Sequence, residues 1–205
     1  MIAHRPIQNV FLSASVPLPS RNAQYFVTAD VIAIRDAVRA LVMVILERGA
    51  RLVFGGHPAI TPMIRLQVLQ SGRPVGDTVV MYQSRFFERS FPEDNQFFER
   101  VVVVDAVDDN RDASLAAMRR AMLGQRFQTG IFIGGMEGVE EEYAMFRDMH
   151  PKTPALPIAS TGAAAGKLYS ADRLLMRNYE GLSTEISYLT LMRNLTAPRS
   201  RRRRL

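Results

Sequence analysis

The sequence contains no cysteine and no tryptophan, and it has only three histidines. Without cysteine the chain can form no disulfide, no thiolate metal site and no cysteine nucleophile. The few histidines do not occur at the spacing of metal ligands, which argues against a transition-metal centre. Carboxylates, hydroxyls, arginines and backbone amides are therefore the groups left for chemistry, and we predict neither a metal nor a cofactor.

Long hydrophobic runs are also missing. The longest candidate, residues 37–46, is interrupted by Arg39, whereas a membrane-spanning helix needs about 20 apolar residues. The first ten residues include His4, Arg5, Pro6 and Asn9 and contain no signal-peptide core. We therefore expect a cytoplasmic protein without membrane association.

The positive charge is concentrated at the end of the chain. The formal net charge is +6, but five arginines lie among the last seven residues, so that the remainder carries 6 − 5 = +1. We predict one domain over residues 1–197 and a basic, disordered tail over residues 198–205. Such a tail could hold single-stranded nucleic acid through phosphate contacts, which is a less favoured alternative function.

Apolar residues make up 47% of the 205 residues, and their spacing alternates between the periods of strands and helices. This alternation predicts an α/β fold of the Rossmann-like type, with three layers and a mainly parallel central sheet. The predicted strands are residues 10–13, 51–54, 78–82, 100–104, 130–133 and 155–158. The predicted helices are residues 30–47, 59–69, 112–123, 137–149, 162–169 and 183–195. The valine-rich strand 100–104 is expected to be buried on both faces.

Four of the predicted strands are followed by glycine or small polar residues. In a parallel sheet the carboxyl ends of the strands lie along one edge, so these loops should converge there and form a ligand site. The candidate ligand-binding residues are Ser13, Ser15, Gly55, Gly56, His57, Gly134, Gly135, Met136, Glu137, Gly138, Thr161 and Gly162. Any one glycine-rich turn could equally serve only the geometry of a strand-to-helix connection.

The segment from Gly134 to Gly138 combines glycines with a following helix. Glycine allows a phosphate to approach the backbone closely, and the free amides at a helix N-terminus can then bind it. Within that helix, Glu142 flanks the apolar face defined by Val139, Tyr143 and Phe146. A carboxylate in this position could bind ribose hydroxyls or act as an acid or base, or it could simply reach solvent from the helix edge.

Arg85 follows the third predicted strand and could bind an anionic ligand with two parallel hydrogen bonds. An arginine exposed on the surface is the alternative interpretation. His57 could contact a ligand from the second loop, but a single histidine in a turn more often has a structural role.

Residues 133–142 resemble a signature of the SLOG superfamily of Rossmann-like domains, which includes the LOG phosphoribohydrolases. That signature is a proline, two glycines, any residue, glycine, threonine, two residues and glutamate. Counted from Gly138, the family glutamate coincides with Glu142. Ile133 replaces the proline, Val139 replaces the threonine, and one extra residue precedes Gly138. Over residues 11–162 the chain thus looks more similar to the nucleotide-sensing and conflict-system branch than to the LOG enzymes.

This resemblance implies a domain that binds a nucleotide or an NAD-derived ligand, such as ADP-ribose or cyclic ADP-ribose, as a sensor in signalling or antiphage defence. It also implies a homodimer, and a separate sensor domain would either signal through an effector protein as partner or act on its ligand itself. The main alternative is an N-glycosidic hydrolase of nucleoside monophosphates or NAD-like substrates, in which Glu142 and Arg85 are the catalytic residues.

Overall fold

A parallel sheet of six strands forms the centre of the molecule. The computed structural model describes residues 8–20, 22–72, 76 and 78–197, and the predicted basic tail lies outside these ranges. The strands are β1 (Asn9–Ser15), β2 (Arg51–Gly55), β3 (Val79–Ser84), β4 (Val101–Val104), β5 (Thr129–Gly134) and β6 (Ala155–Ile158). Their order is β4-β3-β2-β1-β5-β6, and every neighbouring pair is parallel. The predicted α/β fold with a parallel sheet is confirmed.

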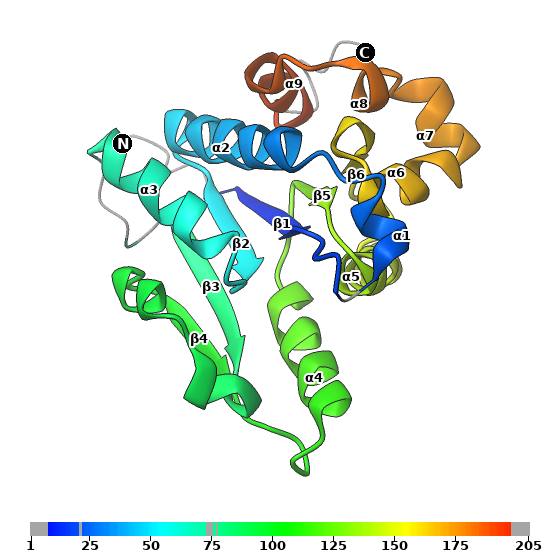
Figure 1. Cartoon of the computed structure of the whole chain (residues 1–205). Coiled ribbons are helices and arrows are strands. Elements are labelled where there is room, and N and C mark those ends of the chain that lie inside the picture. Colours follow the sequence, from blue (N-terminus) through cyan, green and yellow to red (C-terminus); the bar gives the residue numbers. More distant parts are fainter. Residues whose placement is uncertain (1–7, 21, 73–75, 77, 198–205) are drawn as a thin grey trace.

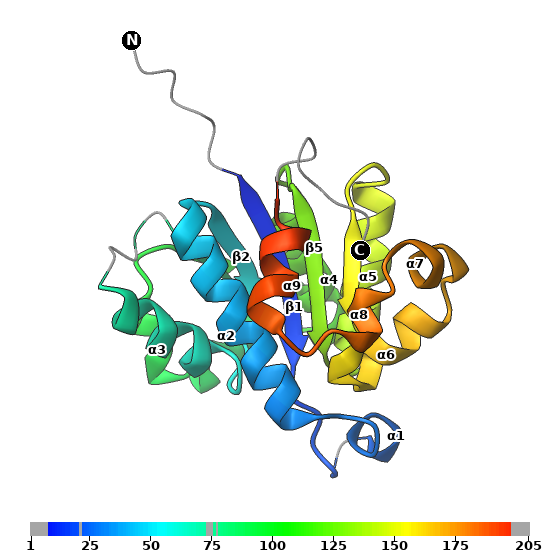
Figure 2. The same ribbon diagram turned by 90° about the horizontal axis from the view of Figure 1, so that it is seen from above.

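Helices cover both faces of the sheet (Figures 1 and 2). One face is covered by α2 (Val31–Arg48), α3 (Thr61–Ser71) and α9 (Tyr188–Leu195), and the other by α4 (Arg111–Leu123) and α5 (Glu137–Met149). Shorter helices complete the chain: α1 (Ala23–Phe26), η1 (Arg85–Ser90), η2 (Glu93–Phe97), η3 (Ala159–Thr161), α6 (Ala163–Ser170), α7 (Arg173–Asn178) and α8 (Gly181–Thr184). None of the described helices is both long and apolar enough to cross a membrane.

Helix α2 illustrates how local sequence sets an element's limits. The Asp30 side chain accepts a hydrogen bond from the Ala33 amide at its start, and Gly49 ends it in the left-handed conformation with φ of 60°. Its buried face includes Ile34, Val38 and Leu41, which pack against the sheet in one hydrophobic core. Here the predicted helix limits agree with the structure.

The second core, between the sheet and helices α4 and α5, is rich in aromatic rings. Phe146 of α5 stacks on Phe11 of β1 with ring centroids 5.4 Å apart, and it contacts Phe132 of β5 edge to face. Gly130 of β5 leaves the space that the Phe146 ring fills, because a Cβ there would lie 2.8 Å from that ring. This packing holds α5 against β1 and β5.

Three local predictions are wrong. Strand β4 lies at the edge of the sheet and is half-exposed, because order along the sheet rather than valine content decides burial. The predicted helix 183–195 is interrupted: α8 ends at Thr184, Glu185 is extended, and α9 begins at Tyr188. Helix α4 is capped by Asn110, whose side chain accepts hydrogen bonds from the amides of Asp112 and Ala113, and not by Asp112 itself.

Candidate functional site

The order of the strands reverses between β1 and β5. From β1 the chain builds β2, β3 and β4 on one side, and β5 and β6 lie on the other. In open α/β sheets the crevice beyond the carboxyl ends of the strands at such a point is where ligands bind. Ser15 at the end of β1 pairs in register with Gly134 at the end of β5. The loop that follows β1 and the loop that follows β5 therefore meet here.

Hydrogen bonds join these loops tightly. The Gly134 amide donates to Thr161 Oγ1 at 2.9 Å, and the Gly135 amide donates to the Ser15 carbonyl oxygen at 2.9 Å. The structure therefore brings Ser15, Gly134, Gly135 and Thr161 together, as the sequence predicts. It also shows that the amides of both glycines are already used inside the protein, so they are not free to bind an anion.

The glycines are required by backbone geometry. Gly134 and Gly135 have φ of 56° and 90°, and a Cβ on Gly135 would overlap the Val139 side chain. Gly162 has φ of 69°, and the next residue, Ala163, is held at φ of 54° although it carries a Cβ. Strained backbone of this kind accumulates at functional sites.

Free amides remain at the start of helix α5. Met136 is the N-cap residue and provides no side-chain cap, and within the described part of the chain the amides of Met136, Glu137 and Gly138 have no hydrogen-bond partner. A helix N-terminus with free amides and a favourable dipole is suited to an anion. The backbone amides available to bind an anion are thus fewer than predicted, because they begin at Met136 and not at Gly134.

Glu142 lies on the side of α5 that faces the sheet. Its side chain is 15% exposed, and its Oε1 lies 3.4 Å from Nε of Arg119, an α4 residue that is 11% exposed and also contacts Glu141. Burial raises the pKa of the Glu142 carboxyl, and it outweighs the opposing effects of Ser13 and Arg119. Glu142 is therefore the largely buried carboxyl group that helical geometry and the resemblance both select.

Ser13 lies on β1 beside this carboxylate. The residue is 2% exposed, and its Oγ lacks a hydrogen-bond partner of ordinary geometry among the described residues, although the hydroxyl is near enough to act on the pKa of Glu142. A buried hydroxyl without a partner costs about 1–3 kcal/mol. A ligand hydroxyl or a water molecule that bonded to it would recover this cost.

Arg119 was not selected from the sequence. The period of α4 places it at the margin of the apolar face beside Met118, where an arginine looks like an ordinary surface residue. Only the packing of α4 against α5 brings it to Glu142. A Cβ on Gly138 would lie 3.2 Å from Arg119 Nη2, so the guanidinium also lies beside the free amides of the first turn.

The segment around α1 also contributes groups that the sequence did not indicate. Asn22 donates a hydrogen bond to Glu137. Lys167 of α6 lies 2.8 Å from Glu140 Oε1 and over the buried ring of Tyr25, 4.6 Å from its centroid. In Figure 2 α1 projects beyond the carboxyl ends of the strands, near the start of α6. These contacts hold α1 beside the start of α5 and partly neutralise its glutamates.

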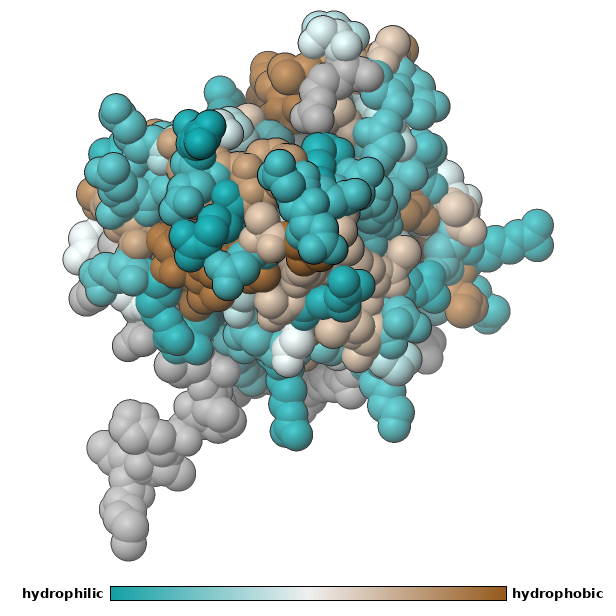
Figure 3. Space-filling model, turned by 90° about the horizontal axis from the view of Figure 1, so that it is seen from below, coloured by the Kyte–Doolittle hydropathy of each residue, from teal (hydrophilic) through white to brown (hydrophobic). Residues whose placement is uncertain are grey.

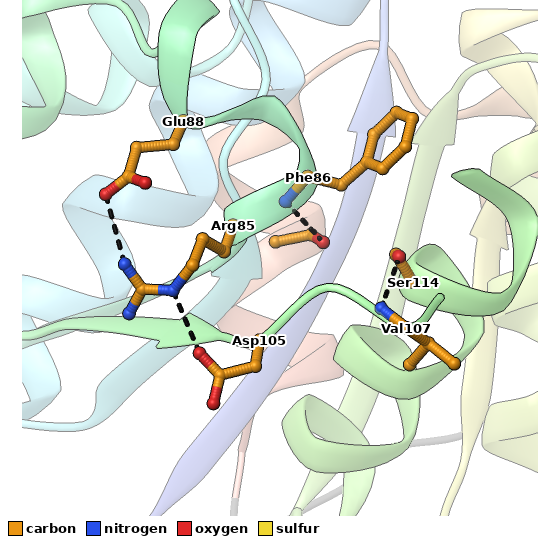
Figure 4. A network of polar contacts seen from close by, with 7 residues as sticks. Arg85, Phe86, Glu88, Asp105, Val107 and Ser114 are labelled. Carbon is orange, nitrogen blue, oxygen red and sulfur yellow. Dashed lines mark hydrogen bonds and ion pairs between the residues drawn. The ribbon is translucent and has the colours of Figure 1, made fainter. Parts of the chain in front are cut away.

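Arg85 lies apart from Glu142 along the sheet. Strands β2 and β1 separate β3, which precedes Arg85, from β5. Arg85 is half-exposed and pairs with Asp105 at 2.9 Å and Glu88 at 3.1 Å (Figure 4). The structure does not bring Arg85 and Glu142 into contact.

Gly55 is the last residue of β2, and Gly56 and His57 form the turn that follows it, beside β1. The Gly56 amide donates to the Tyr82 carbonyl oxygen, and His57 Nδ1 accepts from the Ala59 amide. These bonds explain the turn structurally, while a role in ligand binding stays a prediction. Within the ranges that the structure describes, no three histidine or carboxylate side chains converge as metal ligands do.

A family model, the SLOG cluster3 family, matches residues 24–196. The chain belongs to this family. The match includes the first turn of α5, Glu142 and Arg119, and it confirms the resemblance to the SLOG superfamily. The curated proteins contain no significant match to the chain.

Among solved structures, the SLOG chain is similar to the X-ray structure of TM1055, a structural genomics target. The TM-score is 0.57 at 15% sequence identity, and the match covers 80% of this chain and 81% of the other. At this identity the likeness concerns the fold, which it shows to be Rossmann-like.

Proposed function

We propose that this SLOG domain binds a nucleotide or NAD-derived ligand, such as ADP-ribose or cyclic ADP-ribose, beyond the carboxyl ends of β1 and β5. The observation that carries the proposal is the uncapped N-terminus of α5 at the point where the strand order reverses. Its free amides at Met136, Glu137 and Gly138 would hold a phosphate, with the Arg119 guanidinium beside them.

The glutamates of α5 do not prevent this arrangement. Glu137 contacts Asn22, Glu140 pairs with Lys167, and Glu141 and Glu142 share Arg119. Burial raises the pKa of Glu142, which makes its neutral form more accessible than that of an exposed glutamate. The buried Ser13 hydroxyl and the Glu142 carboxyl are then suited to the hydroxyl groups of a ribose attached to the phosphate.

Thermal unfolding and titration calorimetry with ADP-ribose, cyclic ADP-ribose, NAD and AMP test this proposal. A ligand present at 100 times its dissociation constant should stabilise the fold by about 2.7 kcal/mol. Arg119→Gln should weaken binding at least about tenfold, which corresponds to about 1.4 kcal/mol. Arg120→Gln, an exposed neighbour on the same helix, is the matched control. Absence of stabilisation by all four ligands would refute the proposal.

A sensor role in signalling or antiphage defence, exerted through an effector protein, extends this proposal. It is supported by the similarity of the degenerate signature around Gly138 to the sensing branch of the superfamily. The cytoplasmic location stays a prediction from the sequence.

The alternative of N-glycosidic hydrolysis is favoured by one specific observation, the buried Glu142 with its raised pKa. A carboxyl group whose pKa is raised by burial is better suited than an exposed one to hold a proton and deliver it to a leaving group. Chromatographic detection of a released base would show the activity. Glu142→Gln should then abolish release while ligand binding persists, whereas unchanged release would exclude Glu142 as the acid.

A further inference from the structure

The first two turns of helix α5 carry more negative than positive charge. Four carboxylates lie there, and among the described residues two cations pair with them: Glu137, Glu140, Glu141 and Glu142 against Arg119 and Lys167. With every group charged the balance is 2 − 4 = −2, and it is −1 when Glu142 holds a proton. Acidic residues stabilise the positive end of a helix dipole, but here they also lie next to the free amides at which we place a phosphate.

The family signature does not account for most of these glutamates. Counted from Gly138, the signature specifies only the position of Glu142, and it leaves the positions of Glu140 and Glu141 open. Glu137 falls within the stretch that is one residue longer than in the signature. The charge at this end of α5 is thus a property of this chain that the signature does not require.

The cations are shared, and several of the carboxylates reach solvent. Arg119 pairs with both Glu141 and Glu142, and Glu137 contacts an uncharged partner, the side-chain amide of Asn22. Glu137 is exposed, and the Glu141 side chain is 58% exposed. Figure 3 shows the molecule from below, and its apolar side chains form separate patches among hydrophilic ones. These charges therefore act through water, where salt weakens them.

The charge of the phosphate decides how it is received at this position. A terminal phosphate monoester carries a charge of about −1.5 to −2 at pH 7, whereas a phosphate in a diester or a pyrophosphate bridge carries one negative charge. The free amides and the shared Arg119 are suited to one charge. A second charge adds repulsion from the carboxylates, which we expect to weaken binding about tenfold at low salt.

A buried hydroxyl indicates independently that a polar ligand group binds beside these carboxylates. Ser13 is 2% exposed next to Glu142, and its Oγ lacks a hydrogen-bond partner of ordinary geometry among the described residues. A ribose hydroxyl attached to the phosphate would supply that partner.

We propose that Glu137, Glu140 and Glu141 are specificity residues, which select a singly charged phosphate, as in a phosphodiester or a pyrophosphate bridge, against a doubly charged terminal phosphate. This inference rests on the proposed function, because it concerns the same phosphate position. Among the ligands named above it favours ADP-ribose, cyclic ADP-ribose and NAD over AMP. It also makes nucleoside monophosphates poor ligands for the alternative hydrolase.

Titration calorimetry with AMP and with the methyl ester of its phosphate tests the proposal, because these ligands share base and ribose and differ by one charge at pH 7.5. The ester should bind at least about tenfold more tightly in 50 mM salt, and this ratio should fall at least about threefold in 500 mM salt. Equal affinities, or tighter binding of AMP, would overturn this inference and leave the proposed phosphate site standing. Failure of both ligands and of ADP-ribose to bind would overturn both.

Charge-neutral variants separate repulsion from any contact with the methyl group. Glu137→Gln removes one charge and keeps an oxygen that can accept from Asn22, so it should narrow the ratio at least about threefold by raising the affinity for AMP. Glu141→Gln should do the same, because Arg119 then pairs with one carboxylate fewer. The matched control is Glu93→Gln, at an exposed glutamate of η2, which packs against α3 on the opposite face of the sheet. An unchanged ratio in both α5 variants would overturn the proposal.

Discussion

Replacing Gly162 with alanine should destabilise the protein far more than replacing a glycine that is strained but uncrowded. Gly162 has φ of 69° and ψ of −155°, a combination that essentially only glycine adopts. A Cβ there would overlap the Thr28 carbonyl oxygen and lie 2.8 Å from the Thr28 carbonyl carbon. Both obstacles are backbone atoms, and the Asp30 amide ties this segment to the Thr161 carbonyl oxygen at 3.2 Å, so neither side can yield easily.

The structure allows the size of the effect to be estimated. Backbone strain contributes about 1–3 kcal/mol and the forced contact a further 1–3 kcal/mol, or about 2–6 kcal/mol in total. In a chain of this length each kcal/mol lowers Tm by about 2–4 °C. Gly49→Ala is the matched control, because Gly49 also has a positive φ of 60° but has no atom within 4 Å of a Cβ. It should cost only about 1–2 kcal/mol.

Urea and thermal unfolding followed by circular dichroism would measure both variants against the wild type. The difference between them measures the contact between Gly162 and Thr28 together with the greater backbone strain at Gly162, because Gly49 has ψ of 29° and lies in the left-handed region that other residues can adopt at modest cost. Equal losses of unfolding free energy in Gly162→Ala and Gly49→Ala would refute the close approach of these two loops.

Three further outcomes follow from the site. Glu142→Gln should change how stability depends on pH: above the ordinary pKa of a glutamate the wild-type folded state binds more protons than the unfolded state, because burial raises the pKa. The free energy of unfolding of the wild type should therefore fall relative to that of the variant as pH rises through this range, by up to about 1.4 kcal/mol per pH unit. Urea unfolding at several pH values measures this, and an equal pH dependence in both proteins would contradict it. Arg119→Ala should lower the free energy of unfolding by about 1–3 kcal/mol by leaving Glu142 without its cation, whereas the exposed Arg120→Ala should change it by less than about 0.5 kcal/mol. Phe146→Ala should cost about 3–5 kcal/mol in the same assay, since the ring is fully buried against Phe11, and a loss below 1 kcal/mol would contradict that packing.

Much of the fold could be predicted from local patterns. The six strands and the helices α2, α3, α4 and α5 were all expected, because their apolar periods lie within each segment. The short helices α1 and α7 were missed, since four to six residues carry too little periodic signal. The break between α8 and α9 was missed for a related reason, as no glycine or proline marks it.

Part of the candidate site could be predicted in the same way. Glu142 was found because its orientation on α5 is a property of helical period alone. Arg119 was not found, because its contact with Glu142 depends on how two helices pack side by side. The free amides were only partly predicted. The amides of Gly134 and Gly135 donate to Thr161 and Ser15, and these partners are distant in the chain, so the sequence did not indicate that the two amides are occupied.

The sequence by itself determined the six strands, the four long helices, the parallel arrangement of the sheet and the loops that gather at its carboxyl edge, since apolar period and glycine placement are local properties. Only the tertiary structure decided that β1 and β5 are neighbours, that β4 lies at an open edge despite its four valines, and that Arg119 meets Glu142. Strand order and helix packing depend on contacts between distant segments, and those contacts are the ones that form the site.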